Sequence, residues 1–366
     1  MIAFISSTLH QTWNSIIMAK KLFPQEKCDL FILDFCSSYN EIANELRKED
    51  IFENIYPCQI AKFQCCDIKN PITRKIRKCM YFIGWKHFLR QSVHITKQYD
   101  RVFVAFNDEP SCFLMTQMKA LNPNIKPCYF EDGANDYIAD AHPKHRGFKK
   151  FFGTLFGIDY SIGDSIDTTY VVSPPCVASS DYILETIPII DPDKDLELKA
   201  IMNRVFSYDP YVINERSVFL YSPFQTIEFA EKSHQIVHKI IANYGIDKLL
   251  FKDHPRVPAV GYDGIRKYPR EKETLWECVS MNNDCSNKVL ISVISTSMYI
   301  PKLLFNQEPI LVFLFRLIPA FSNEKRAKSF YEFVLRLRSL YSDPSKVIIP
   351  ETEEELFAYL DGVMNE

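Results

Sequence analysis

The sequence predicts an α/β protein made of two halves, each with a parallel sheet covered by helices. Short apolar, β-rich runs alternate with helical patterns from the first residue to the last. These runs lack the polar alternation of half-exposed strands, which is typical of parallel strands buried on both faces. The length of 366 residues also favours two domains over one.

The first half, residues 1–190, starts with a strand and a helix over residues 11–22, where Trp13, Ile16 and Ile17 share one side. Residues 174–175, two prolines, close its last strand. The strands expected in this half are Ile2–Ser7, Asp29–Asp34, Arg101–Phe106, Lys126–Phe130 and Tyr170–Ser173.

A turn-rich, charged stretch, Asp191-Pro192-Asp193-Lys194-Asp195, indicates a linker over residues 191–215. The second half, residues 216–366, contains helical patterns at 226–244, 323–341 and 352–364. Its expected strands are Ser217–Tyr221, Lys248–Lys252, Lys288–Ile294, Pro309–Phe315 and Val347–Ile349. Two such halves imply a cleft between them, with ligands bound beyond the carboxyl ends of the strands.

Composition excludes several functional classes. The 43 basic and 46 acidic residues leave a net charge of −3, which argues against a general nucleic-acid-binding protein. The ten glycines form no GxGxxG and no GxxxxGK[ST] motif, so an ordinary dinucleotide fold and a P-loop enzyme are both disfavoured. Eleven cysteines without a CxxC pair, together with no signal peptide and no long apolar span, predict a cytoplasmic protein with free thiols.

The first candidate site is the loop Glu131-Asp132-Gly133, directly after the strand Lys126–Phe130. A carboxylate at a strand end can act as a general base, and the glycine permits a tight backbone turn. An acidic turn without chemistry is the alternative interpretation.

Two further candidate loops lie in the second half. Lys252-Asp253-His254-Pro255-Arg256 follows a strand and gathers groups that favour a phosphate. Ser295-Thr296-Ser297 stands between a strand and a helix, where hydroxyls and backbone N–H groups can hold an anion. A solvated basic loop and simple helix capping are the respective alternatives.

Taken in order, these three motifs resemble those of the bacterial sialyltransferases: an acidic pair with glycine, then His-Pro, then paired hydroxyl residues. The opening run Ser6-Ser7-Thr8-Leu9-His10-Gln11 is similar to the first-strand turn of glycosyltransferase family 52, which includes lipooligosaccharide sialyltransferases. The resemblance implies the GT-B fold, in which two Rossmann-like domains face each other across a deep cleft.

The resemblance also implies roles for individual residues. Asp132 would be the base that deprotonates the acceptor, with Glu131 as the fallback. His254, aided by Lys252, Pro255 and Arg256, would stabilise the departing phosphate of CMP. The remaining donor-binding residues would be Gly133, Ser295, Thr296 and Ser297. Residues 1–190 would bind the acceptor and residues 216–366 the CMP-sugar.

The activity implied by the resemblance is inverting transfer of sialic acid from CMP-sialic acid to a terminal sugar, such as galactose. The acceptor would be a bacterial lipooligosaccharide or capsule glycan, including one linked to a lipid. No cofactor or metal is expected, because CMP is a good leaving group and Asp191-Pro192-Asp193 falls in the linker rather than at a strand end. Transfer of another CMP-activated nonulosonic or Kdo-type sugar remains open, as does a non-catalytic glycan-binding role.

Two basic and apolar stretches have two interpretations each. They are Arg74–Lys78, with Met80, Tyr81, Phe82 and Trp85 after it, and Phe333–Arg338. Each is typical either of peripheral contact with the inner face of the cytoplasmic membrane or of an amphipathic helix packed on its own core.

Overall fold

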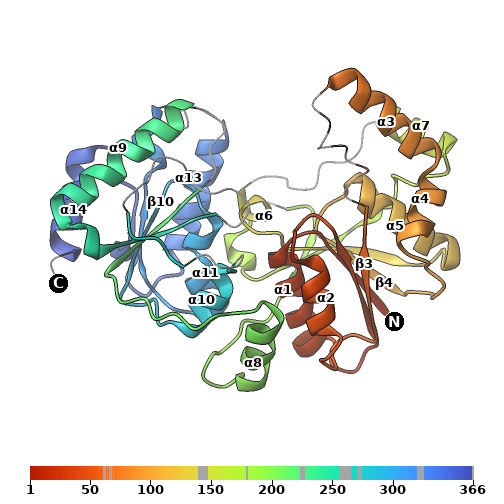
Figure 1. Cartoon of the computed structure of the whole chain (residues 1–366), viewed down its shortest axis with the longest axis horizontal. Coiled ribbons are helices and arrows are strands. Elements are labelled where there is room, and N and C mark those ends of the chain that lie inside the picture. The colour runs from red at the N-terminus through yellow and green to blue at the C-terminus, as the bar shows by residue number, and fades with distance from the viewer. Residues whose placement is uncertain are drawn as a thin grey trace. The chain divides into compact units, whose positions relative to one another are not determined.

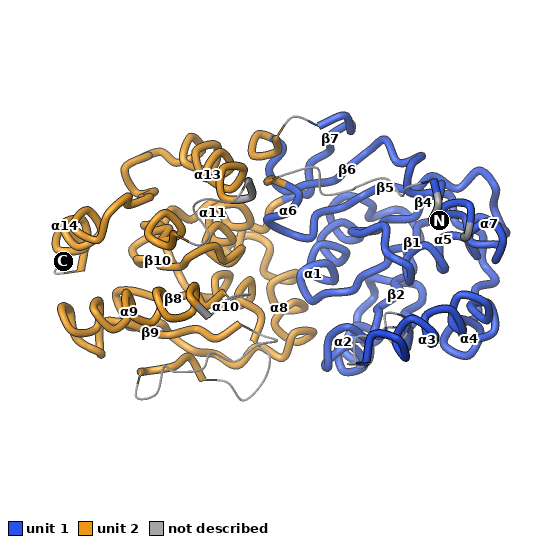
Figure 2. Tube along the Cα trace, turned by 90° about the horizontal axis from the view of Figure 1, so that it is seen from above, with its two compact units in different colours: residues 1–136, 140–174, 179–188 blue, residues 137–139, 175–178, 189–366 orange. Residues whose placement is uncertain are grey.

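The computed structural model divides the chain into two compact units (Figures 1 and 2). Unit 1 comprises Met1–Asp136, Asp140–Pro174 and Ser179–Pro188, and unit 2 comprises Tyr137–Ala139, Pro175–Ala178 and Ile189–Glu366. The structure describes residues 1–60, 63, 65, 68, 70–138, 147–178, 180–222, 227–254, 265–269, 274–319 and 325–364.

Unit 1 is built on a seven-stranded sheet of parallel strands in the order β3-β2-β1-β4-β5-β6-β7. The strands are β1 (Ile2–Ser6), β2 (Cys28–Leu33), β3 (Asn54–Cys58), β4 (Arg101–Val104), β5 (Lys126–Phe130), β6 (Thr168–Val171) and β7 (Ile183–Thr186). All five strands expected in this half are present. The sequence analysis did not anticipate β3 and β7, which are the two edge strands.

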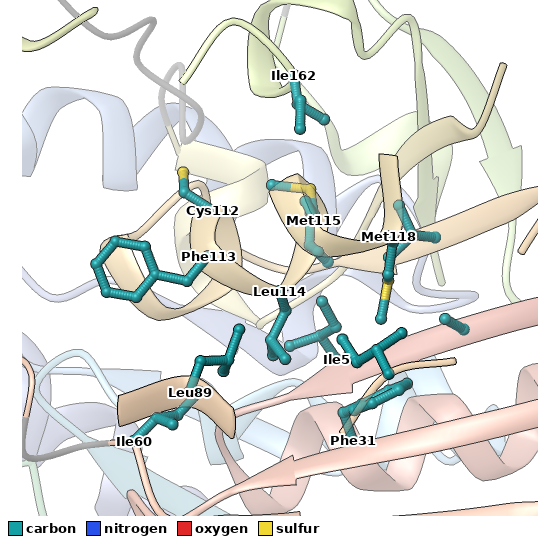
Figure 3. Packing of buried hydrophobic residues seen from close by; sticks show 14 of the residues in the cluster. Ile5, Phe31, Ile60, Leu89, Cys112, Phe113, Leu114, Met115, Met118 and Ile162 are labelled. Atoms are coloured by element: carbon teal, nitrogen blue, oxygen red, sulfur yellow. The ribbon is translucent and has the colours of Figure 1, made fainter. Parts of the chain in front are cut away.

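The helices of unit 1 follow the strands in alternation. They are α1 (Leu9–Ile17), continued by a π-helical turn over Met18–Leu22, then α2 (Tyr39–Leu46), α3 (Pro71–Ile83), α4 (Trp85–Ser92), α5 (Glu109–Leu121), α6 (Ala134–Ile138) and α7 (Gly147–Leu155). Figure 3 shows Leu114 and Met118 of α5 directed toward Ile5 and Phe31 of the sheet and Met115 directed toward Ile162, all of them buried. This core fixes the strand ends that carry the acid loop.

Unit 2 has a five-stranded parallel sheet in the order β12-β11-β10-β8-β9. Its strands are β8 (Ser217–Leu220), β9 (Leu249–Lys252), β10 (Val289–Ser292), β11 (Ile310–Phe313) and β12 (Val347–Ile348). Its helices are α8 (Leu196–Val205), α9 (Ile227–Tyr244), α10 (Trp276–Asn282), α11 (Ile300–Phe305), α13 (Lys325–Arg338) and α14 (Glu353–Val363). The predicted α/β class with two Rossmann-like sheets is confirmed, and the cleft between the halves stays a prediction.

The segment expected to be a linker contains a packed helix. Within residues 191–215, α8 buries Leu198, Ile201, Met202 and Val205. These four side chains recur at helical spacing, and the neighbouring run of aspartates and prolines obscured that periodicity. Asp191 to Asp195 nevertheless forms the expected turn, in which the carboxylates of Asp191 and Asp195 accept backbone and lysine hydrogen bonds.

Two short segments from the first half of the sequence belong to unit 2. The ring of Tyr137, at the end of α6, stacks on Phe333 of α13 with centroids 5.4 Å apart. Arg336 of α13 donates hydrogen bonds to the carbonyls of Tyr137 (2.8 Å) and Cys176 (2.9 Å). Phe333, Val334 and Leu337 are buried. The Phe333–Arg338 stretch is therefore an amphipathic helix packed on its own core.

No helix in the described part of the chain is long and apolar enough to cross a membrane.

Candidate active site

The acid loop, Glu131–Gly133, lies at the carboxyl edge of the first sheet. The strands are parallel, and the registers Ile5↔Val104 and Val104↔Tyr129 place the ends of β1, β4 and β5 side by side. The strand order reverses between β1 and β4, which is where open α/β sheets bind their ligands. The loop after β1 therefore borders the expected binding position, and the acid loop after β5 lies on the same edge, one strand beyond β4.

Asp132 is oriented through one of its two carboxylate oxygens. Its Oδ1 accepts hydrogen bonds from Gln11 Nε2 (2.5 Å) and from the hydroxyl of Thr8 (3.3 Å). Among the residues that the structure describes, none donates a hydrogen bond to Oδ2. The side chain is only partly buried. One oxygen is thus anchored and the other has its lone pairs available to a substrate hydroxyl.

The start of α1 supplies both donors to Asp132. Thr8 is the N-cap of this helix, and its hydroxyl oxygen accepts the backbone N–H of Gln11. The Gln11 Oε1 atom accepts the backbone N–H of Ser7 (2.5 Å), which turns Nε2 toward Asp132. Helix capping therefore sets the position of the carboxylate as well as the start of the helix.

The environment raises the pKa of Asp132 to about 6 from its usual value of 3.8. Burial is the largest cause, because it disfavours the charged form. The hydrogen bond from Gln11 lowers the pKa, and the negative charge of Asp136 raises it again. A carboxyl group with a pKa near 6 remains ionised at neutral pH yet takes a proton more readily than an exposed aspartate.

The backbone of the acid loop is held by glycine geometry and a capping carboxylate. Gly133 has a φ of +124°, which a side chain at this position would strain. Asp136 Oδ2 accepts the backbone N–H of Asp132 at 2.8 Å. The sequence analysis expected Gly133 to permit a tight backbone turn, and its positive φ agrees with that expectation.

Glu131, the fallback base in the sequence analysis, is engaged in the fold. The residue is buried, and its Oε2 accepts the backbone N–H of Val172, after β6, at 2.7 Å. Its Oε1 lies 3.8 Å from His10 Nε2. Asn14 Nδ2 donates to the carbonyl of Glu131 (3.1 Å) and lies 3.2 Å from the same histidine nitrogen. These contacts tie β5, β6 and α1 together beneath Asp132.

The second sheet presents a chain of three serines at its own carboxyl edge. Ser292, the last residue of β10, donates from Oγ to the carbonyl of Leu220 in β8 (2.6 Å) and accepts the backbone N–H of Ser295 (3.2 Å). Its hydroxyl also lies 3.3 Å from that of Ser222, which follows β8. This serine chain spans β8 and β10, where the strand order of the second sheet reverses.

The predicted hydroxyl loop, Ser295–Ser297, extends from the serine chain. Ser295 caps a short 3₁₀ turn, Thr296–Met298, and its Oγ accepts the backbone N–H of Ser297 (3.3 Å). All three residues are partly exposed. In the described part of the chain, no hydrogen bond engages the hydroxyls of Thr296 and Ser297, so both can donate to a ligand.

The basic loop after β9 is partly described. Lys252 is buried, and its ammonium donates to the carbonyls of Asp253 (3.3 Å) and Thr274 (3.2 Å) beside the ring of Tyr268. His254 is partly exposed, while Pro255 and Arg256 lie outside the described residues. Because adjacent strands are about 4.8 Å apart, the loops after β9 and β10 begin roughly 10 Å from each other on one edge.

Within the described ranges, no three His, Cys, Asp or Glu side chains group so as to hold a metal ion.

Sequence reasoning gave no role to four residues that build these two edges. Thr8 and Gln11, which it noted only as part of the run Ser6–Gln11, donate hydrogen bonds to Asp132, and Ser222 and Ser292 form the serine chain. A signal existed for the first pair. Residues 11, 12, 14 and 15 are all polar although they belong to a helix that packs on the sheet, and the structure buries all four. Buried polar side chains need partners, and the acid loop and first turn supply them.

Comparison with solved structures finds similarity over the whole chain at low sequence identity. The glycosyltransferase of kitacinnamycin is 11% identical with a TM-score of 0.49, over 100% of this chain and 90% of that one. The spinosyn forosaminyltransferase SpnP is 9% identical with a TM-score of 0.48, over 100% and 99%. The UDP-N-acetylglucosamine 2-epimerase from Rickettsia bellii is 11% identical with a TM-score of 0.44, over 99% and 97%.

Neither a protein-family model nor a curated protein sequence matches the chain. The GT-B class is built from two Rossmann-like domains, and this chain contains two Rossmann-like sheets.

Proposed function

We propose that the protein is an inverting glycosyltransferase of the GT-B class in which Asp132 is the catalytic base. One observation carries the proposal: Asp132 combines a carboxylate oxygen fixed by Gln11 and Thr8, a second oxygen open to a ligand, and a pKa raised to about 6. A general base needs this combination of fixed geometry and a pKa near the working pH.

In the proposed reaction, Asp132 Oδ2 takes the proton of an acceptor hydroxyl. The acceptor oxygen forms a bond to the anomeric carbon of the donor sugar while the bond from that carbon to the nucleotide phosphate breaks. The electron pair leaves with the phosphate, and one displacement of this kind inverts the anomeric centre. Glu131 holds the loop in place and does not exchange the proton.

The donor is proposed to bind to unit 2 as a CMP-sugar. The hydroxyls of Thr296 and Ser297, positioned by the serine chain, would donate to the phosphate. His254 would donate to the same phosphate as charge develops on it. The order of acid, His-Pro and hydroxyl motifs supports sialic acid as the sugar transferred, with a galactose-terminated surface glycan as acceptor.

The proposed reaction uses no divalent metal, because hydrogen-bond donors stabilise the departing CMP. Turnover in excess EDTA should equal turnover with added magnesium or manganese. Activity that disappears in EDTA and returns with either ion contradicts this part of the proposal.

Measuring CMP release from CMP-sialic acid, with and without lactose, tests the function directly. We expect acceptor-dependent release by the wild-type protein and little by the Asp132→Asn variant. CMP-Kdo and UDP-N-acetylglucosamine, assayed in parallel, distinguish the donor classes. Release from CMP-Kdo alone would retain the mechanism and change the sugar, whereas release from UDP-N-acetylglucosamine alone would overturn the CMP-sugar assignment.

Binding of CMP without turnover of any donor, on any galactoside offered, would favour the non-catalytic glycan-binding alternative. Isothermal titration with CMP and with lactose tests this alternative, because a non-catalytic glycan-binding protein should bind lactose although it turns over no donor.

A further inference from the structure

The outer face of α3 is apolar and open to solvent. The helix has no buried residue, although it contains four large apolar side chains that are highly exposed: Ile72 (69%), Ile76 (58%), Met80 (59%) and Ile83 (67%). Their spacings of four, four and three residues place them in one stripe along the helix. We call these four residues the apolar stripe.

The opposite face of α3 fixes which way the stripe points. Tyr81 contacts Phe63 (ring centroids 5.2 Å apart), and Phe82 contacts Phe113 of the core (5.9 Å). At the other end Asn70 caps the helix by accepting the N–H groups of Ile72 and Thr73. The aromatic residues are thus anchored inward, and the apolar stripe is left on the solvent side.

The segment that contains the apolar stripe is basic. From residue 70 to residue 92, which covers α3 and α4, the sequence has six Lys and Arg residues and no Asp or Glu: Arg74, Lys75, Arg77, Lys78, Lys86 and Arg90. The whole chain, by contrast, has a net charge of −3. On the helical wheel Lys75 and Arg77 lie on either side of the stripe. Apolar residues bordered by basic ones match the interface of an anionic lipid bilayer.

A second exposed apolar pair lies on α7, where Phe151 and Leu155 are each about two-thirds exposed (63% and 62%). The end of this helix joins the start of α4, because Trp85 Nε1 donates to the carbonyl of Phe156 at 2.7 Å. Figures 1 and 2 place α3, α4 and α7 at the same end of unit 1.

We propose that the apolar stripe of α3, with its basic border, binds the surface of a membrane that contains anionic lipid. With 13 residues, α3 is too short to span a bilayer, which requires about 20, but it suits insertion in the plane of the interface. A second copy of the chain is a poorer occupant, because a symmetric contact would bring two faces of like charge together. The inference is independent of the proposed reaction.

Flotation with lipid vesicles tests the proposal using the full chain and no sugar donor. The wild-type protein should float with 3:1 phosphatidylcholine–phosphatidylglycerol vesicles and bind pure phosphatidylcholine vesicles at least about fivefold more weakly, the effect of one basic residue. Ile76→Ser/Met80→Ser should weaken binding about tenfold, because less apolar area would be buried in the interface. Lys75→Gln/Arg77→Gln should weaken it by about fivefold per charge removed, and high salt should act in the same direction.

Matched controls separate a specific surface from general stickiness. Leu196→Ser removes an apolar side chain of similar exposure (63%) from α8. Lys126→Gln removes an exposed charge at the first residue of β5, outside α3 and α4. Both should bind vesicles like the wild type. Equal flotation of the wild type and the Ile76→Ser/Met80→Ser variant, both folded by circular dichroism, would overturn the proposal. The proposal would also be overturned if neither protein bound vesicles and the wild type were a dimer whereas the Ile76→Ser/Met80→Ser variant were a monomer.

Discussion

The carboxyl edges of the two sheets have different chemistry. In unit 1 the edge presents a carboxylate, Asp132, whose Oδ1 is held by Gln11 and Thr8, while no described residue donates to its Oδ2. In unit 2 the edge presents neutral hydroxyls, arranged by Ser292 between β8 and β10. Both edges lie where the strand order reverses, so the same architecture displays a proton acceptor in one unit and hydrogen-bond donors in the other.

The two edges also differ in how strongly their polar side chains are buried. A base needs a tuned pKa, and Asp132, the proposed base, is partly buried, which raises its pKa to about 6. A site for an anion needs donors that are neither buried nor already engaged, and Thr296 and Ser297 are partly exposed. Substitutions at the two edges should therefore change different measured quantities.

The largest expected effect is on the rate. Asp132→Asn retains the size of the side chain but removes its basicity, so turnover should fall by about 10²–10⁴-fold. CMP affinity, measured by calorimetry, should stay nearly unchanged because the proposed CMP site lies in unit 2. Glu131→Gln is the matched control and should retain far more activity, since Glu131 is engaged by Val172 N–H. Near wild-type turnover by folded Asp132→Asn protein would falsify the assignment of the base.

The pH dependence of kcat/KM should report the same carboxyl. The pKa of Asp132 is raised to about 6, and only the ionised form accepts a proton. Below pH 6, kcat/KM should therefore fall about tenfold per pH unit, and above pH 6 it should level off. If kcat/KM instead stayed level down to about pH 4 and fell only below it, the acting group would be an ordinary exposed carboxylate.

Stability should change in opposite directions at the two acids. Glu131→Ala leaves the buried N–H of Val172 without its acceptor, so the free energy of unfolding should fall by about 1–3 kcal/mol. Glu131→Gln, which retains an acceptor oxygen, should recover much of this loss. Asp132→Asn should instead raise the unfolding free energy at pH 7 by about 1–2 kcal/mol, because the native site disfavours the ionised form.

The sign of the Asp132 effect can be checked by varying the pH. The native pKa of about 6 exceeds that of an unfolded aspartate, about 3.9, so the native state binds this proton more tightly. The contribution of Asp132 to stability should fall as the pH rises from about 4 to about 6 and then stay level. Urea titrations of wild type and Asp132→Asn should diverge over that interval, and parallel curves would contradict the argument.

The smallest effects are expected in unit 2. Thr296→Val removes a hydroxyl proposed to contact the phosphate, so CMP should bind about 2–10-fold more weakly with little change in melting temperature. Ser292→Ala removes the donor to Leu220 and the acceptor for Ser295 N–H, so both the melting temperature and CMP affinity should decrease. Identical CMP affinity in both variants and the wild type would place the nucleotide elsewhere.

In the first sheet, the internal strands were predictable from the sequence and the edge strands were not, whereas both edge strands of the second sheet, β9 and β12, were expected. Buried strands such as Cys28–Leu33 are apolar enough to be recognised without a structure. The edge strand β3 includes Pro57, which cannot donate to a ladder and is tolerated only at an edge or a bulge. The other edge strand, β7, exposes most of its residues. Neither has the continuous apolar pattern on which the prediction depended.

At the candidate site, the sequence indicated the loops that carry polar side chains, but it could not show which of their atoms are already hydrogen-bonded within the fold. Glu131 and Asp132 are adjacent acids and cannot be ranked from the sequence. The distinction comes from Val172, 41 residues beyond Glu131, which engages that carboxylate. Lys252 likewise suggested a phosphate ligand, but the contacts made by its ammonium group, to the carbonyls of Asp253 and Thr274, depend on how the chain folds around β9.

Two short segments of the first half, Tyr137–Ala139 and Pro175–Ala178, belong to unit 2, and this limits which fragments of the protein can fold alone. A fragment that begins at Ile189 would lack Tyr137, whose ring stacks on Phe333, and Cys176, whose carbonyl binds Arg336. A chimaera that joined residues 1–188 to the second half of a different protein would remove Phe333 and Arg336 from beside Tyr137. Residues 1–188 and 189–366 are therefore not interchangeable modules, and changes to the proposed donor site are better made by substituting loops within unit 2.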